Sequence, residues 1–192
     1  MNTPDKRSEI VQAALELITE KGFHGAPMAM IAEKSGVAVG TIYRYFENKD
    51  VLINTLYLDL EDKITGTLRS GYSTTNPFRE RFLHLGTKLL RYFIANPLHF
   101  RYIEQYHNSP YGTSLRRDRL LEKHGDQRDI FTALFTEGVA QQVLKDFPLP
   151  VLFSLAFGPL LGLARNHILG FIVLDDPLIT KAVEACWDGV RR

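Results

Sequence analysis

A short segment near the start of the chain concentrates groups that form hydrogen bonds. The sequence VGTIYRY at residues 39–45 holds a hydroxyl, two phenols and a guanidinium. If this segment is helical, Ile42 and the following Phe46 face inward. The outward side then presents Thr41, Tyr43, Arg44 and Tyr45. Such groups bond phosphates and base edges, and Lys49 is placed to clamp one more phosphate as a point charge.

The residues before this segment have the spacing of a helix-turn-helix. Ala32, Gly36 and Ile42 are spaced four and six residues apart. A small residue in the first helix lets the second helix cross closely, and a glycine in the turn adopts a positive φ without a Cβ clash. An aliphatic residue in the second helix packs back onto the first. Ile31 and Val37 complete the buried wedge, so the segment predicts two crossed helices that hold residues 39–45 outward.

The rest of the chain must supply the elements that support this pair. Helical spacing dominates, as in Ile10, Ala13, Ala14, Leu17 and Ile18, and strand alternation is almost absent. We expect Thr3 to cap the first helix and Gly22 to end it. The expected helices cover residues 4–21, 27–34, 39–46, 49–68, 78–95, 98–107, 114–144, 149–173 and 177–190, with a possible break at Gly125. The fold class predicted is all-α, with about nine helices.

These residues resemble the TetR family of transcriptional regulators. The resemblance covers about residues 8–60, and the segments AALELITEKGF and GVAVGTIYRYFENKDVL carry it. The later chain fits by helix count and length. The resemblance implies an N-terminal three-helix helix-turn-helix domain at residues 1–50 and a C-terminal helical bundle at residues 51–192, bridged by a helix at about residues 49–68. It also implies a homodimer that binds double-stranded DNA and a small effector.

The predicted DNA contacts combine both lines of reasoning. They are Val39, Gly40, Thr41, Tyr43, Arg44, Tyr45 and Lys49. Several positions where the family usually has a hydrogen-bonding residue are apolar here, namely Ala26, Ala29, Ala38 and Val39. Fewer donors imply fewer fixed base contacts, although Val39 is suited to touch a thymine methyl group.

Two further sets of residues are predicted in the C-terminal part. A ligand pocket is mostly apolar with a few polar groups, and its candidates are Phe82, Tyr106, His107, Phe131, Phe135, Phe157, Asn166 and His167. Few charges occur in these helices, so a largely apolar effector is expected. Helices that are apolar on nearly all sides need a symmetric partner. The expected dimer interface contains Leu155, Gly158, Leu161, Gly162, Leu169 and Trp187.

The apolar run from Phe147 to Ala164 has two interpretations. It approaches the length of a membrane span, but prolines and glycines interrupt it and Arg165 follows. We therefore expect a buried helix or a subunit interface and no membrane contact. Basic residues concentrate on the helix expected at 114–144, at Arg116, Arg117, Arg119, Lys123 and Arg128. We expect a solvated face there, with contact to flanking DNA or an anionic effector as the alternative.

The sequence argues against an enzyme. The six histidines show no metal-ligand spacing, and no phosphate-binding glycine loop or nucleophile elbow is present. The pair Glu104 and His107 lacks a third ligand. We therefore expect no cofactor and no metal. The polar N-terminus contains no signal core, so a cytoplasmic protein is expected. The function predicted is a ligand-responsive, sequence-specific repressor released from a palindromic operator. The alternative is a helical small-molecule-binding protein that has lost operator binding or acts through a protein partner.

Overall fold

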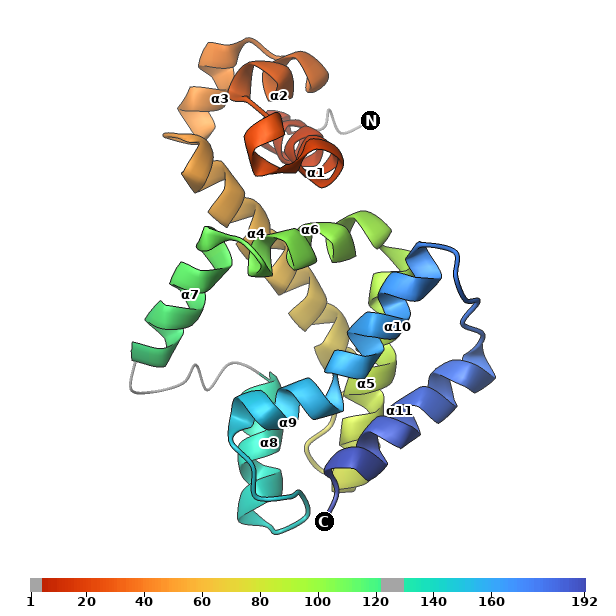
Figure 1. The fold of residues 1–192 in the computed structure, drawn as a ribbon. Helices are drawn as coiled ribbons and strands as arrows, with labels where there is room; N and C mark the ends of the chain where they lie inside the picture. Colours follow the sequence, from red (N-terminus) through yellow and green to blue (C-terminus); the bar gives the residue numbers. More distant parts are fainter. Residues whose placement is uncertain (1–4, 122–129) are drawn as a thin grey trace. The chain divides into compact units, whose positions relative to one another are not determined.

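The computed structural model describes the backbone of residues 5–121 and 130–192, and their side chains except those of residues 116–121. All the regular structure in these ranges is helical, apart from one isolated β-bridge between Leu144 and Arg191. The helices, labelled in Figure 1, are α1 (Lys6–Gly25), α2 (Met28–Lys34), α3 (Val39–Tyr45), α4 (Lys49–Arg69), α5 (Phe78–Ala95), α6 (Pro97–His107), α7 (Pro110–Leu121), α8 (Ile130–Ala140), α9 (Leu149–Ala156), α10 (Gly158–Ile168) and α11 (Asp176–Val190). The predicted all-α fold is confirmed.

The chain divides into two compact units. The first runs to Asp62 and includes Leu98–Arg117, and the second comprises Lys63–Pro97 and Asp118–Arg192. Helix α4, which we expected to bridge two domains, belongs to the first unit up to Asp62 and to the second beyond it. Helix α6 lies in the same unit as the N-terminal helices.

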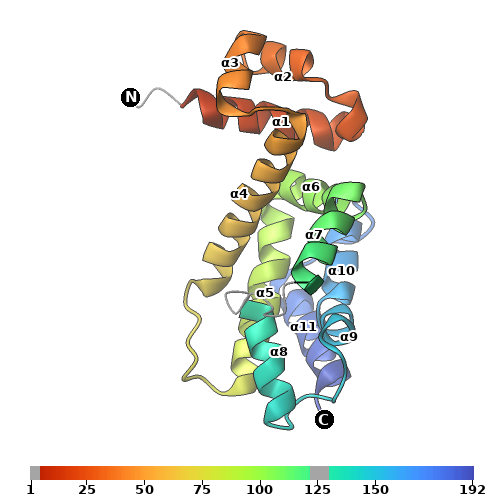
Figure 2. The same cartoon turned by 90° about the vertical axis from the view of Figure 1, so that its left-hand side faces the viewer.

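The first unit is built around α1. Asp5 caps this helix and accepts a hydrogen bond from the Arg7 amide at 3.3 Å, while the predicted cap Thr3 lies outside the described residues. The apolar stripe of α1 is buried, including Ile10 and Ile18. Gly22 interrupts the helix with a φ of 74°, as its position predicted, and one further turn reaches Gly25. Figure 2 shows α2 and α3 lying along α1.

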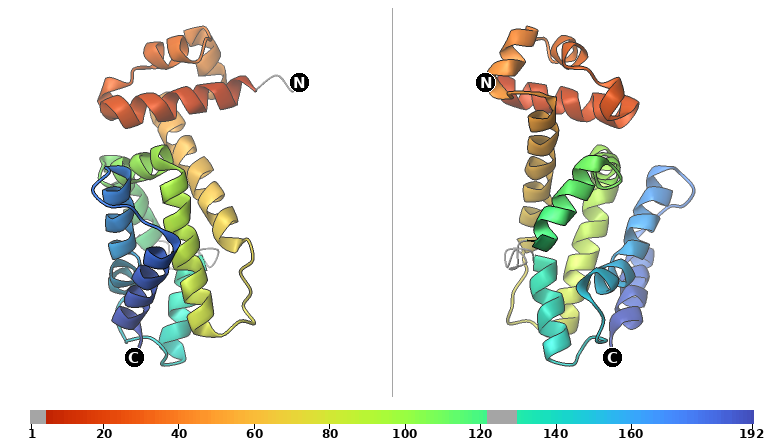
Figure 3. Two further views of the ribbon diagram at one scale, coloured as in Figure 1. Left: turned by 90° about the vertical axis from the view of Figure 1, so that its right-hand side faces the viewer. Right: turned by 60° about the vertical axis from the view of Figure 1, so that its left-hand side comes forward.

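The second unit packs α5 against α10 and α11. Figure 3 shows these helices side by side, with α9 next to α10 and α11. Gly86 of α5 permits this approach, because a Cβ at that position would stand 2.7 Å from Val183 of α11. The core between these helices includes Leu85, Leu160 and Val183, all buried. The second unit is therefore a helical bundle centred on α5.

One of the expected helices is divided in the structure, and another begins at a different residue. The helix expected at 149–173 breaks at Phe157 and ends at Ile168. Pro159 has no N–H with which to continue the hydrogen-bond ladder. Beyond Ile168, the turn at Gly170 has a φ of 79°. The helix expected at 114–144 begins earlier, at Pro110, because proline is favoured in the first turn of a helix. Its last described part, α8, ends at Ala140, and the possible break at Gly125 lies outside the described residues.

The apolar run is less covered than a buried helix would be. Leu149–Ile168 is long and apolar enough to span a membrane by length and composition, but only 28% of its most apolar window is buried in the chain. Val151, Phe153 and Leu155 are exposed along α9. This face of α9 is therefore exposed in the single chain.

Candidate nucleic-acid interface

The turn between α2 and α3 is set by short-range contacts. Gly36 has a φ of 68°, the conformation that the spacing required of it. The amide of Val37 donates to the carbonyl of Ala32 at 3.0 Å, and the Ser35 hydroxyl donates to that of Ile31 at 2.7 Å. These bonds end α2 and turn the chain sharply into α3. Ala32 and Ile42 are buried, as expected for the crossing of the two helices.

Helix α3 presents its polar side chains to solvent. Tyr43 is 52% exposed, and Tyr45, Arg44 and Val39 are also exposed. Thr41 is half-buried, and Gly40 is exposed, with open space where a Cβ would stand. The opposite side is anchored by Ile42 and Phe46, which are buried. The arrangement offers a hydroxyl, two phenols and a guanidinium on one accessible surface.

Lys49 differs from the other predicted contacts. It is half-buried at the start of α4, and its ammonium donates a hydrogen bond to the carbonyl of Phe23. Burial lowers the pKa of Lys49. The preceding Asn48 caps α4, because its side-chain oxygen accepts from the Val51 amide at 2.9 Å. The ammonium is thus directed to a backbone carbonyl.

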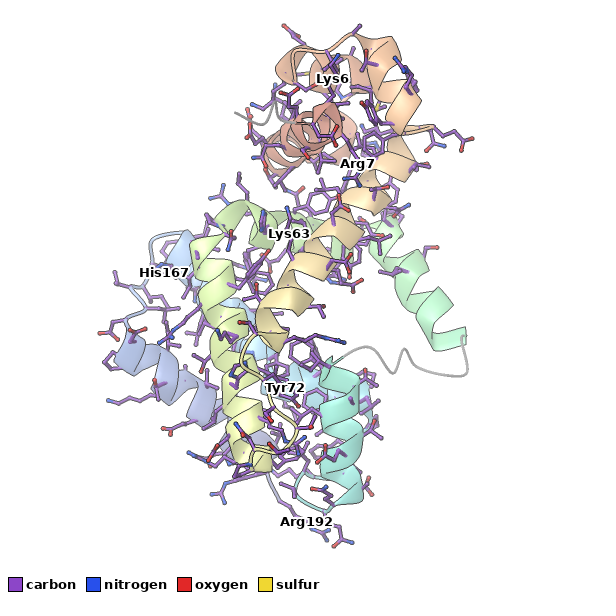
Figure 4. The ribbon with its side chains drawn as sticks, turned by 180° about the vertical axis from the view of Figure 1, so that it is seen from behind. Lys6, Arg7, Lys63, Tyr72, His167 and Arg192 are labelled. Carbon is purple, nitrogen blue, oxygen red and sulfur yellow. The ribbon has the colours of Figure 1, made fainter. Side chains whose placement is uncertain are left out.

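Arg7 lies beside the inward anchor Phe46, although no sequence pattern indicated it. Its guanidinium lies 3.0 Å from Asp59 of α4 and 5.8 Å from the centre of the Phe46 ring. Figure 4 labels Arg7 at the start of α1. It therefore joins α1 to α4 and lies over the ring of Phe46, the residue that follows α3. A local pattern could not point to it, because Asp59 lies 52 residues away in sequence.

The predicted effector residues fall into separate groups. Phe82, Phe131, Phe135 and Phe157 form an aromatic cluster in the second unit, in which ring centres lie 4.7–5.7 Å from Phe157. Phe153, which the prediction omitted, joins them at 5.6 Å from Phe157. This cluster is the part of the predicted pocket that the second unit brings together.

The four polar candidates lie elsewhere. Tyr106 and His107 are in the first unit, where the Tyr106 ring stacks on Tyr57 at 4.0 Å and its hydroxyl donates to Asn54 at 2.7 Å. Asn166 is exposed near the end of α10. The His167 Nδ1 accepts a hydrogen bond from the Leu174 amide at 3.2 Å. Among the described residues, no group of three or more His, Cys, Asp or Glu residues is arranged to hold a metal ion.

The residues predicted for the dimer interface differ in exposure. Leu155 and Leu169 are exposed, and Gly158, Leu161 and Gly162 are partly exposed. Trp187 is buried and packs against Phe78 and Phe82, at 6.0 and 5.3 Å between ring centres, so its ring faces the core. Phe171 and Val173, which the prediction omitted, are 76% and 81% exposed. Both belong to the apolar segment FIVL, of which the sequence predicts residues 171–173 to be helical, whereas α10 ends at Ile168.

The basic residues expected on one helix cannot be placed on a face. The side chains of Arg116, Arg117 and Arg119 are not described, and Lys123 and Arg128 lie outside the described residues.

The chain is similar in sequence and fold to known proteins. Residues 77–191 match the tetracyclin repressor-like C-terminal domain, and residues 10–56 match the bacterial regulatory proteins of the tetR family. An uncharacterised HTH-type transcriptional regulator of Haemophilus influenzae is 28% identical over 106 residues, which are 55% of this chain. That match spans little more than half of the relative, 57% of its length.

Two solved structures extend the comparison to nearly the whole chain. A TetR family transcriptional regulator from Vibrio parahaemolyticus is 33% identical, with a TM-score of 0.78, and the match covers 98% of this chain and 100% of that one. FadR from Bacillus subtilis, solved in complex with stearoyl-CoA, is 20% identical with a TM-score of 0.75, covering 95% and 98%. The latter likeness concerns the fold alone.

Three observations support the same family. They are the helix-turn-helix geometry, the match of more than half of the chain to a TetR C-terminal domain, and the similarity to the Vibrio protein. This chain belongs to the TetR family of DNA-binding transcriptional regulators, which are not enzymes.

Proposed function

We propose that this protein is a repressor that binds a palindromic operator through the outward face of α3 and leaves it when a small, largely apolar effector binds. The observation that carries the proposal is the two-sided character of α3. Ile42 and Phe46 are buried on one side, and Tyr43, Arg44 and Tyr45 are exposed on the other. A helix held in this way is suited to enter a major groove with its polar side chains toward the bases.

Arg44 is the proposed base-reading residue. Its guanidinium is exposed, and no ion pair occupies it in the described part of the chain. A bidentate contact to a guanine contributes about 1–3 kcal/mol. Arg44→Ala should therefore weaken operator binding by about that amount and relax the preference for one base pair. Arg79→Ala is the matched control, because Arg79 is also an exposed arginine but belongs to the second unit.

The operator is first obtained by selecting bound fragments from random duplex DNA. Binding of the selected fragment is then measured at several salt concentrations. A regulator that contacts phosphates loses affinity steeply with salt, because counterions are released on binding. A shallow salt dependence, together with equal binding by wild type and Arg44→Ala, would contradict the proposal. That result would favour a ligand-binding protein without operator recognition.

The palindrome follows from a proposed homodimer. The exposed apolar side chains of the second unit extend over α9, the end of α10 and the loop before α11, and include Val151, Phe153, Leu155, Leu169, Phe171 and Val173. A two-fold partner covers such a face and places two copies of α3 about 34 Å, or a multiple of it, apart. Sedimentation should give a dimer at micromolar concentration, and a monomer would contradict this. A small dimer bound at a promoter can block RNA polymerase without an additional protein, and this favours repression over activation. We propose that the protein acts in the cytoplasm.

The effector is proposed to contact the aromatic cluster of the second unit. Phe131 is half-buried and Phe153 is exposed, so the cluster extends from the core to the surface. Because FadR from Bacillus subtilis was solved in complex with stearoyl-CoA, this compound is the first probe, with coenzyme A alone as its control. We expect release of the selected DNA by the acylated compound only. Release by coenzyme A alone would contradict an apolar effector.

A further inference from the structure

Helix α3 is anchored to the first unit by few side chains. Of its seven residues only Ile42 is buried, and the second anchor is Phe46, the buried residue that follows the helix. The Phe46 amide donates to the Ile42 carbonyl at 2.9 Å and closes the last turn of α3. Because the helix is short, a displacement of either anchor turns its outward face. The position of the Phe46 ring therefore helps to set the orientation of α3.

Arg7 of α1 holds this ring from the side. Its guanidinium carbon lies 5.8 Å from the centre of the Phe46 ring, within the range of a cation–π contact. One terminal nitrogen of the same guanidinium lies 3.0 and 3.3 Å from the two carboxylate oxygens of Asp59. Asp59 belongs to α4. The guanidinium thus connects α1, α4 and the residue at the end of α3.

The ion pair and the ring contact depend on each other. A guanidinium is planar, so it can bind a carboxylate while its face lies on an aromatic ring. The side chains of Arg7 and Asp59 are 38% and 30% exposed, and a pair so open to water contributes little to stability by itself. What the pair does provide is a fixed place for the guanidinium against a buried anchor of α3.

We propose that Arg7 is a positioning residue, which holds α3 in its DNA-binding orientation through the Phe46 ring, and that Asp59 supports this role by holding Arg7. This inference rests on the proposed operator binding. The alternative role for Arg7 is a direct contact to a DNA phosphate, for which the guanidinium would have to exchange Asp59 for the phosphate. The two roles predict opposite effects of removing the Asp59 charge.

Asp59→Asn is therefore the first test, with the selected operator fragment as the ligand. If Arg7 contacts a phosphate, the variant frees it and removes a repulsive charge, so the affinity rises. If Arg7 positions Phe46, the variant loosens the guanidinium, and we expect an affinity loss of about threefold. Glu16→Gln is the matched control, because Glu16 pairs with Lys34 at 2.9 Å in the same unit with similar exposure. This control should raise the affinity or leave it unchanged.

Arg7→Met tests the ring contact, since it keeps an apolar stem and removes the guanidinium. It should lower the affinity about fivefold. The double variant Arg7→Met/Asp59→Asn leaves the net charge unchanged, and it should lose no more than Arg7→Met alone because Asp59 acts through Arg7. Its slope of log K against log salt should equal that of wild type, whereas loss of a phosphate contact lowers the slope by about 0.9.

Three results would overturn the proposal. They are a gain of affinity in Asp59→Asn, wild-type affinity in Arg7→Met, and a reduced slope in the double variant. Each variant is assayed at a temperature where circular dichroism shows it fully folded, so a residue that only stabilises the fold leaves the affinity unchanged. Asp59→Asn carries the test if Arg7→Met does not fold.

Failure of the proposed operator binding is recognised separately. Wild type and Arg44→Ala are measured in the same salt series. A shallow wild-type slope contradicts operator binding itself and removes the basis of this inference. A steep wild-type slope with no loss of affinity in the Arg7 and Asp59 variants contradicts only the positioning role.

Discussion

The ion pair between Arg81 of α5 and Glu137 of α8 gives an asymmetric prediction for stability. Arg81 donates through both terminal nitrogens to the two carboxylate oxygens, one bond measuring 2.8 Å. The side chain of Arg81 is only 5% exposed, whereas that of Glu137 is 35% exposed. Removing Glu137 should therefore lower the free energy of unfolding by a different amount from removing Arg81.

The magnitudes follow from this difference in exposure. Glu137→Ala leaves a guanidinium in a nearly dry site, and losing one partner of a buried pair costs about 3–5 kcal/mol. Because Glu137 reaches solvent, water can partly replace its carboxylate. We therefore expect Glu137→Ala to lower the free energy of unfolding by about 3 kcal/mol or somewhat less. Arg81→Met keeps an apolar stem beside Phe78 and leaves a carboxylate that water can solvate, so about 1 kcal/mol is expected. The double variant should cost less than the two single variants together.

The assay is urea unfolding followed by the fluorescence of Trp187, the single tryptophan, which lies in the second unit. Loss of stability should be greater for Glu137→Ala than for Arg81→Met. Equal losses, or the reverse order, would refute the reasoning from exposure. Strict additivity in the double variant would show that the two side chains act independently.

The same pair predicts a pH dependence. The hydrogen bonds from Arg81 lower the pKa of Glu137. A carboxyl group with a lower pKa in the folded state stabilises the fold above its unfolded-state pKa of about 4.3, and this contribution is lost as the pH falls through the folded-state value. The difference between wild type and Glu137→Ala should therefore be largest at neutral pH and shrink in acid. A difference that grows in acid would contradict the sign.

Three other substitutions test packing and backbone conformation by urea unfolding, followed by Trp187 fluorescence for Phe157→Ala in the second unit and by circular dichroism for the two glycine variants in the first unit. Phe157→Ala should lower the free energy of unfolding by about 3–5 kcal/mol, since the ring is fully buried and contacts at least three other aromatic rings; a loss below about 1 kcal/mol would show that the cluster is loosely packed. Gly36→Ala should destabilise by about 1 kcal/mol because of its positive φ, whereas Gly40→Ala, in a helix with open space around it, should be neutral or stabilising by up to about 1 kcal/mol. Equal effects of the two glycine variants would contradict the assigned turn.

The helix-turn-helix could be predicted because its determinants lie close together in sequence. The small residue at Ala32, the glycine at Gly36 and the inward Ile42 all fall within one short stretch of the chain. Local steric rules then fix which side of α3 faces out. The interruption of α1 at Gly22 is local in the same sense.

Contacts between residues far apart in the chain could not be predicted from the sequence. The carbonyl that holds Lys49 belongs to Phe23, 26 residues earlier, and a backbone group leaves no signature in a sequence. Tyr106 looked like a pocket residue by type, but α6 belongs to the first unit, where its hydroxyl bonds Asn54. The spacing of apolar residues does not predict the break at Phe157, because an apolar run can continue through Pro159 without a change of period.

The central claim is that the outward face of α3 lies against DNA. Photocrosslinking tests it most directly, with 5-iodouracil placed at successive positions of the selected DNA and the attached peptide identified by mass spectrometry. We predict crosslinks at Tyr43 or Tyr45, the exposed aromatic side chains of α3. Crosslinks confined to peptides of the second unit would contradict it.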